Sequence, residues 1–142
     1  MQRWAFVRLN RVTNVVVRRL GLRRFRGGPV LYLTTIGRKT GQSRTTPLLH
    51  LREGDGWVVV ASNGGADWEP GWWLNLRAGT AATVQVDGVD VPVRGTEISG
   101  PEREQMWKRL VDEVFDFDTY QRKVRRRIAV VRLEPVHEVA RP

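Results

Sequence analysis

Tight-turn signals between short apolar segments constrain the fold of this chain more than any other feature. The pairs at 55–56 and 87–88 are Asp-Gly, and each separates two strand-like segments. A third turn, 37–41, begins and ends with glycine. Asp-Gly pairs are typical of two-residue hairpin turns, which join antiparallel strands. The sequence therefore predicts antiparallel pairing instead of the strand–helix alternation of a parallel sheet.

Six segments have the apolar, β-branched content of strands. They cover 30–36, 45–52, 57–62, 83–86, 89–94 and 128–133. The segment 57–62 is apolar almost throughout, which indicates a central strand, whereas Pro92 favours an edge position for 89–94. Six antiparallel strands can curl into a small barrel, so we expect an α+β fold.

Helical patterns occur at four places. They cover 2–20, 71–76, 99–114 and 118–126. Ser99 and Glu102 match a capping box, in which two side chains bond to the backbone of a helix start. Asp118 begins a weaker form of this signal. We expect residues 1–29 to form a basic helix and linker, and residues 30–142 to form one domain.

Positive charge is concentrated at the start of the chain. Residues 1–52 hold 12 Lys or Arg and no acid, while the remaining 90 residues hold 12 cations and 15 acids. This asymmetry indicates an anionic partner. An amphipathic helix within 1–28 suits an anionic membrane surface, and packing on the domain is the alternative. Nucleic acid is not expected, because no aromatic stacking pattern accompanies the charge.

Composition excludes several kinds of site. The chain has no cysteine, and its lone histidines, His50 and His137, make no convincing metal site. We expect His50 to be a surface or hydrogen-bonded residue within a strand. No apolar run approaches the ~20 residues of a membrane span. The expected location is the cytoplasm, with peripheral attachment to the inner face of the membrane as a further option.

The turn 37–41 and its flanks carry the strongest chemistry. Arg38, Lys39 and Arg44 supply cations, and the two glycines let the backbone approach a ligand closely. Arginine offers phosphate oxygens a planar fork, and lysine offers a point charge. The pattern favours an anion site at the mouth of the sheet, and a solvated polar turn is the alternative.

Two further clusters leave alternatives open. Trp68, Trp72 and Trp73 either wall a flat ligand or form part of the core. Residues 62–65 either present backbone N–H groups to a ligand or form a plain turn. No Gly-x-Ser-x-Gly motif occurs, and neither histidine has a signature partner. An enzyme with this sequence would therefore need a cofactor for its chemistry.

Three ordered blocks resemble the deazaflavin-dependent nitroreductase family. They read Thr34-Thr35-Ile36-Gly37-Arg38-Lys39-Thr40-Gly41-Gln42-Ser43-Arg44 with Pro47-Leu48, then Val60-Ala61-Ser62-Asn63-Gly64-Gly65, then Pro70-Gly71-Trp72-Trp73-Leu74-Asn75-Leu76. The resemblance implies a split β-barrel that binds reduced coenzyme F420, a deazaflavin with a phosphate-linked oligoglutamate tail.

The resemblance also implies roles for individual residues. The phosphate and tail would be held by Arg38, Lys39, Thr40 and Arg44. The cofactor would be lined by Thr45, Thr46, Pro47, Leu48 and Leu49, by the backbone of Val60, Ala61, Ser62 and Asn63, and by Gly71, Trp72, Trp73, Leu74 and Asn75. On the substrate side, Tyr120 would orient or protonate the acceptor, and Phe117 stands where some relatives carry a tyrosine.

The leading hypothesis is a reductase that transfers a hydride from reduced coenzyme F420 to an electron-poor acceptor. Enones, quinones and nitro compounds are the acceptors considered. The alternatives are a non-catalytic flavin or deazaflavin carrier and an FMN-dependent oxidoreductase. A homodimer is left open, since no interface can be read from the sequence.

Overall fold

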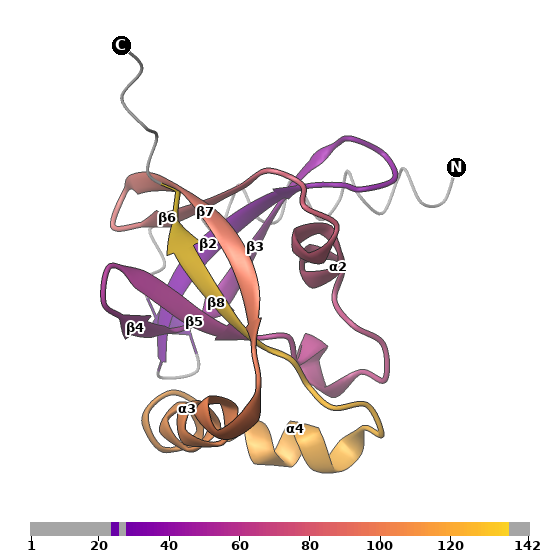
Figure 1. Cartoon of the computed structure of the whole chain (residues 1–142), viewed down its shortest axis with the longest axis vertical. Helices are drawn as coiled ribbons and strands as arrows, with labels where there is room; N and C mark the ends of the chain where they lie inside the picture. The colour runs from indigo at the N-terminus through magenta and orange to yellow at the C-terminus, as the bar shows by residue number, and fades with distance from the viewer. Residues whose placement is uncertain (1–23, 26–27, 137–142) are drawn as a thin grey trace.

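A curled antiparallel sheet carries three α-helices in the computed structural model, which describes residues 24–25 and 28–136 (Figure 1). The longer strands are β2 (Gly28–Ile36), β3 (Ser43–Leu49), β5 (Gly56–Val60), β6 (Ala82–Val86), β7 (Val89–Ile98) and β8 (Val130–Pro135). The short strands are β1 (Arg24–Phe25) and β4 (Leu51–Glu53). All strand pairs are antiparallel, so the predicted α+β class and antiparallel pairing are confirmed.

One continuous stretch of chain joins the two ends of the sheet. The strand order is β1-β2-β6-β7-β8-β5-β4, and β3 pairs with β2 outside this path. β3 and β4 therefore pair with opposite ends of the sheet, yet only His50 separates them in sequence. The expected single strand 45–52 is thus two strands, and the bend between them curls the sheet into a barrel (Figure 1).

Helices cover the barrel in two places. A short turn of helix, η1 (Asn63–Gly65), follows β5, and α2 (Gly71–Arg77) precedes β6. The helices α3 (Gly100–Glu113) and α4 (Phe117–Lys123) follow β7 and precede β8 in the sequence, and they lie side by side (Figure 1). The helix expected over 2–20 lies outside the described residues. No helix in the described part of the chain is long and apolar enough to cross a bilayer.

Alternate residues of β5 pack in two separate hydrophobic clusters. Trp57 and Val59 belong to the cluster that includes the tryptophans of α2. Val58 and Val60 belong to the cluster that includes Met106 of α3 and residues of α4. A strand covered on both faces reads as a continuous apolar run, so the predicted central position of this strand is confirmed.

Two predicted helix caps differ from the structure. Ser99 occupies the cap position of α3, but its side chain makes no capping hydrogen bond. α4 is capped by Asp116, whose carboxylate accepts a hydrogen bond from the Thr119 N–H at 3.3 Å. The cap expected at Asp118 is wrong, because that carboxylate instead accepts a 2.7 Å bond from Trp107 Nε1 of α3.

The edge position predicted from Pro92 is also wrong. β7 lies between β6 and β8. Pro92 pairs with Thr83 of β6, and the pairing with β8 begins only at the next residue, Val93. Pro92 O accepts a 2.9 Å bond from Val136 N, just beyond β8, so β7 has neighbours on both sides at the proline and only the N–H of Pro92 is missing.

His50 is buried and not at the surface, and it lies between β3 and β4 instead of within a strand. Its side chain is 6% exposed, and its Nδ1 has no hydrogen-bond partner among the described residues. Its backbone N–H donates to Pro29 O at 3.3 Å, at the bend between β3 and β4. Burial lowers the pKa of the imidazole, because the charged form loses its hydration.

Candidate active site

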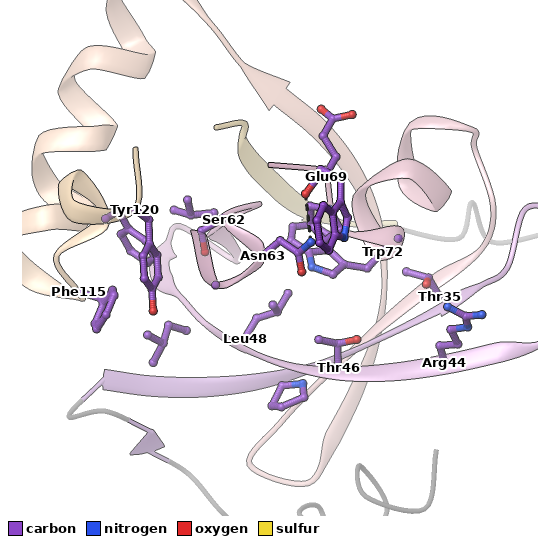
Figure 2. Close-up of a pocket in the computed structure, with 18 residues that line it drawn as sticks. Thr35, Arg44, Thr46, Leu48, Ser62, Asn63, Glu69, Trp72, Phe115 and Tyr120 are labelled. Atoms are coloured by element: carbon purple, nitrogen blue, oxygen red, sulfur yellow. Dashed lines mark hydrogen bonds between the residues drawn. The ribbon is translucent and has the colours of Figure 1, made fainter. Parts of the chain in front are cut away.

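A cavity of about 690 Å³ lies between β3, the loop that follows β5, and the helices α2 and α4 (Figure 2). Figure 2 shows Thr35 and Arg44 at one end of it, and Phe115 and Tyr120 at the other. Between these ends, Leu48 and Trp72 contribute apolar surface. The cavity therefore has a cationic end, an apolar middle and an aromatic end with a hydroxyl.

This cavity is lined by many of the residues that were named from the sequence. They are Arg44, Thr46, Pro47, Leu48, Leu49, Val60, Ser62, Asn63, Gly71, Trp72, Phe117 and Tyr120. They come from β3, β5, η1, α2 and α4, so the fold brings the three sequence blocks and α4 to one place.

Other named residues do not line the cavity. They are Arg38, Lys39, Thr40, Thr45, Ala61, Trp73, Leu74 and Asn75. Ala61 and Trp73 belong to the core inside the barrel, and Thr45 Oγ1 is 2.7 Å from Thr34 Oγ1 on the neighbouring strand. Arg38 and Lys39 are exposed on the turn that follows β2.

Asn75 fixes the position of the 37–41 turn. Its Oδ1 accepts 3.1 Å bonds from both the backbone N–H and Nη1 of Arg38. Its Nδ2 donates a 3.1 Å bond to Thr35 Oγ1 of β2. Both partners of Asn75 are distant in sequence, and the side chain is buried. The amide therefore ties α2 to β2 and holds the cationic turn beside the sheet.

Arg44 is the cation in the cavity wall. It lies on β3 opposite Thr35 of β2. Its Nε is buried and has no hydrogen-bond partner among the described residues. A buried donor without an acceptor costs roughly 1–3 kcal/mol, so this atom suits a phosphate or carboxylate oxygen of a ligand.

The aromatic end of the cavity is built around α4. The ring centroid of Phe115 lies 5.3 Å from that of Tyr120 and 5.4 Å from that of Phe117. A Cβ placed on Gly65 would lie 3.2 Å from Tyr120 Cδ1, so a glycine here lets the loop pack closely on the tyrosine ring. Tyr120 is therefore held between η1 and the phenylalanines.

The tryptophans named together in the sequence separate in the structure. Trp68 is 71% exposed at the rim of the cavity, Trp72 lines the cavity, and Trp73 is buried in the barrel core. The side-chain amide of Asn63 donates a 3.0 Å bond to Trp68 O and holds this rim segment. Trp72 thus forms part of a cavity wall, as one alternative expected, and Trp73 forms part of the core, as the other expected.

Several lining residues were not assigned to the site from the sequence. They are Thr35, Glu69, Pro70 and Phe115, while Gly64 and Trp68 were named only within clusters whose alternatives stayed open. Thr35, Gly64 and Pro70 fall inside the three sequence blocks, which could have indicated them. Glu69 and Phe115 carry no such signal, because the fold alone brings them to the cavity. The described residues include no group of three or more His, Asp or Glu side chains arranged for a metal ion.

Comparison with known proteins agrees with this geometry. Residues 6–135 match the family described as F420H(2)-dependent quinone reductase. An F420H(2)-dependent quinone reductase of Mycobacterium tuberculosis (strain ATCC 25618 / H37Rv) is 33% identical over 139 residues, which cover 92% of this chain and 93% of that protein.

Solved structures share the fold. An F420-H2 dependent reductase, FDR-A, aligns with a TM-score of 0.67 at 34% identity and covers 75% of this chain and 94% of its own. A structure described as a domain-swapped dimer aligns with a TM-score of 0.69 at 30% identity and covers 94% of this chain and 98% of its own. The deazaflavin family recognised from the sequence is confirmed: the chain belongs to the F420H(2)-dependent quinone reductase family.

Proposed function

We propose that this protein is an oxidoreductase that transfers a hydride from reduced coenzyme F420 to a quinone. The observation that carries the proposal is the polarity of the cavity, with Arg44 Nε, which has no partner in the described part of the chain, at one end and Tyr120 at the other. Family membership over residues 6–135 supports the same cofactor and acceptor. Of the acceptors considered from the sequence, the quinone is the one that the family's description names.

The residues present fit a flat cofactor with an anionic tail. Leu48, Val60 and Trp72 offer apolar surface to a ring system, and Arg44 offers a buried donor to a phosphate oxygen. Arg38 and Lys39, exposed on the adjacent turn, neutralise the remaining charge of a polyanionic tail.

The other residues named from the sequence take supporting positions. Trp73 and Asn75 act from behind the cavity wall, where they are buried. Thr40 belongs to the turn, Thr45 and Ala61 lie next in sequence to residues of the wall, and Leu74 lies on α2 between Trp73 and Asn75. Thr46, Pro47, Leu49, Ser62, Asn63 and Gly71 line the cavity directly.

When bound, the reduced cofactor supplies the hydride. Reduction of a quinone to its hydroquinone takes that hydride, with its two electrons, and one proton. The Tyr120 hydroxyl would orient the quinone oxygen by a hydrogen bond and supply the proton, which solvent would then restore to the tyrosine. Phe115 and Phe117 exclude water from this end of the cavity, and neither can donate a proton.

Replacement of Arg44 tests the cofactor site. We expect Arg44→Met to weaken F420 binding by at least ~10-fold, which corresponds to about 1.4 kcal/mol, because a buried charged donor is lost. Fluorescence titration of the full chain measures the dissociation constant. Arg94→Met is the matched control, since Arg94 is exposed on β7 and does not line the cavity. Unchanged affinity in folded Arg44→Met would contradict the assignment.

The double variant Arg38→Ala/Lys39→Ala extends the same titration to the turn. We expect this double variant to bind F420 at least ~10-fold more weakly than the wild type does, because both tail contacts disappear. A deazaflavin without the tail should bind this double variant almost as tightly as it binds the wild type. Equal losses for both ligands would contradict a tail contact, since they would point to collapse of the turn.

Turnover separates the reductase from the two alternatives. A carrier would bind F420 but oxidise the reduced form no faster when a water-soluble quinone is added. An FMN-dependent enzyme would bind FMN more tightly than F420 in parallel titrations. Either result would contradict the proposed function.

We further propose attachment to an anionic membrane surface through residues 1–28, at the inner face of the membrane, with the catalytic domain in the cytoplasm. The concentration of cations in this segment supports the proposal, as does the lipid-like character of many quinones. Nucleic acid is not among the proposed partners.

We also propose a homodimer, because one structural relative is described as a domain-swapped dimer. A single-protomer mass in light scattering at micromolar concentration would contradict this proposal.

A further inference from the structure

Arg126 binds the loop that forms one wall of the cavity. Its Nη1 donates a 3.1 Å bond to Ala61 O, and its Nη2 donates 3.1 Å and 3.0 Å bonds to Ser62 O and Ala66 O. Its Nε also donates a 3.2 Å bond to Ala66 O. A single half-buried guanidinium therefore holds three backbone carbonyls of the segment 61–66, from a position about sixty residues later in the sequence.

These bonds set the direction of the neighbouring N–H groups. In a planar trans peptide, the C=O of one residue and the N–H of the next point in opposite directions. Because Ala61 O and Ser62 O face Arg126, the N–H groups of Ser62 and Asn63 point away from it. No hydrogen bond within the described residues uses either N–H group.

The backbone of this loop has the form of an anion-binding nest. Ser62 is in the right-handed helical region (φ −77°, ψ −27°), and Asn63 has φ 49°, in the left-handed region. Successive residues of this kind make their N–H groups converge. Ser62 and Asn63 line the cavity, so the converging donors lie on its wall. A left-handed conformation is unfavourable for asparagine relative to glycine, and the clamp from Arg126 helps to hold it.

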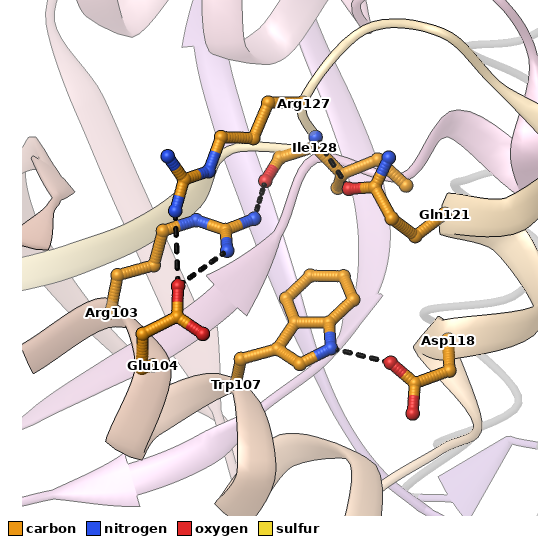
Figure 3. A network of polar contacts seen from close by, with 7 residues as sticks. All are labelled: Arg103, Glu104, Trp107, Asp118, Gln121, Arg127 and Ile128. Atoms are coloured by element: carbon orange, nitrogen blue, oxygen red, sulfur yellow. Dashed lines mark hydrogen bonds and ion pairs between the residues drawn. The ribbon is translucent and has the colours of Figure 1, made fainter. Parts of the chain in front are cut away.

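Arg126 is itself firmly held. Gln121 of α4 donates a 2.9 Å bond from Nε2 to Arg126 O and accepts a 2.9 Å bond from Ile128 N. Arg103 of α3, buried to 7% exposure, donates a 2.7 Å bond to Ile128 O (Figure 3). The segment that carries Arg126 is thus fixed by both helices, and α4 also carries Tyr120.

We infer that Arg126 is a positioning residue: its guanidinium holds the loop 61–66 so that the N–H groups of Ser62 and Asn63 bind a ring carbonyl oxygen in the cavity. The oxygen belongs either to the cofactor ring or to the quinone, since both present the same chemistry. The inference rests on the proposed function and assigns a role to a side chain that does not itself line the cavity.

Three variants of the full chain test this role. Arg126→Met removes every bond to the loop, and Arg126→Lys keeps the charge but loses the planar fork. Arg125→Met is the matched control, because Arg125 is the exposed neighbour and the change in charge is the same. Amide hydrogen exchange should accelerate at least ~10-fold in Arg126→Met at Gly65 and Ala66, whose N–H groups bond to Ser62 O and Asn63 O within the loop, and should stay unchanged in the control.

Two functional readouts distinguish the source of the oxygen. If the loop binds the cofactor ring, Arg126→Met raises the F420 dissociation constant at least ~10-fold. If it binds the quinone, kcat at saturating cofactor falls at least ~10-fold while KM for a water-soluble quinone changes less than about threefold. Arg126→Lys should recover part of whichever quantity is lost. A loss of F420 affinity and a fall in kcat each support the inference.

Other outcomes would overturn it. An Arg126→Met protein with wild-type F420 affinity and wild-type kcat would show that the loop's orientation is irrelevant to the site. Unchanged exchange at Gly65 and Ala66 would show that the clamp is absent, and this measurement needs no ligand. If Arg126→Met does not fold, wild-type affinity and kcat in Arg126→Lys overturn the inference. Failure of the wild type to bind F420 or reduce quinone would instead count against the proposed function.

Discussion

Arginine side chains perform two different tasks at the residue scale. Arg103 and Arg126 donate to backbone carbonyls of the protein itself, and so they hold loops in place. Burial lowers the pKa of Arg103, with the nearby charge of Arg127 acting in the same direction. Arg44 has a buried Nε without a partner among the described residues. Arg103 Nε is likewise buried without a partner among the described residues, so Arg44 differs in its place on the cavity wall, where a ligand can reach its donors.

His50 makes stability depend on pH. Burial lowers its pKa in the folded protein, and the charge of Arg52 adds to the effect. The unfolded chain therefore binds a proton at this position first, at about pH 6.5, as the pH falls. We expect the contribution of His50 to be fully present above pH 6.5 and to be lost as the pH falls below it, by at most about 1.4 kcal/mol per pH unit.

Urea unfolding at pH 7.5 and pH 5.5 measures this effect. His50→Gln removes the titrating group, so its free energy of unfolding should change less between the two pH values than that of the wild type. The lowered pKa values of Glu102 and Asp116 act in more acidic solution, below about pH 4.5, and do not interfere. An equal pH dependence in both proteins would contradict the prediction.

At the scale of secondary-structure elements, glycines decide how closely strands and helices approach. A Cβ at Gly56, the first residue of β5, would lie 2.5 Å from the backbone oxygen of Leu133 on β8. Neither strand can withdraw without breaking its pairing. A Cβ at Gly71, at the start of α2, would lie 3.9 Å from Arg44 Nη1, which is an ordinary contact.

These two glycines make a matched pair of variants. We expect Gly56→Ala to lower the free energy of unfolding by about 1–3 kcal/mol, because the added methyl group forces β5 and β8 apart. Gly71→Ala should change it by less than about 1 kcal/mol. Thermal and urea unfolding measure both. Equal stability of the two variants would show that the close packing of β5 on β8 is not limiting.

Cap placement is also decided at this scale. Asp116 and Asp118 both lie near the start of α4, and either could cap it on local pattern alone. Trp107 Nε1 of α3 donates a 2.7 Å bond to the carboxylate of Asp118, so the residue that caps α4 is Asp116. Packing between two helices thus selects among signals that are equivalent in the sequence.

At the scale of the whole molecule, the uneven charge predicts membrane attachment. We expect the full chain to bind vesicles that contain anionic lipid, and to bind neutral vesicles weakly. Replacement of Arg8, Arg11, Arg18 and Arg19 by Gln should weaken binding by roughly 1 kcal/mol per cation, measured by co-sedimentation. Binding should also fall as salt is raised.

The control removes the same charge from the described domain. Its substitutions are Arg94→Gln, Lys108→Gln, Arg122→Gln and Arg125→Gln, all at exposed positions. This variant should keep most of its vesicle binding. Equal losses in both variants would mean that net charge, and not the N-terminal segment, governs attachment.

The overall architecture could be predicted from the sequence because its causes are local. Asp-Gly turns bring neighbouring strands together, and the continuous apolar run of β5 shows that both faces are covered. The candidate anion site at the 37–41 turn can also be recognised from its residue types, which are cations and glycines. The six expected strands and the α+β class follow from such signals, each within a few residues along the chain.

The division of roles within the site was decided by tertiary structure. Only the folded chain shows that Arg38 bonds to Asn75, 37 residues away, while Arg44 faces the cavity. Arg126 contacts Ala61 O across 65 residues, and no local pattern distinguishes it from Arg125 or Arg127. Turns and strand patterns depend on neighbours in sequence, whereas the partner of a buried donor depends on which distant segments pack beside it. Residue types therefore favour an anion-binding turn and the resemblance to a known family implies an oxidoreductase, whereas three-dimensional packing determines which arginine serves the ligand and which serves the fold.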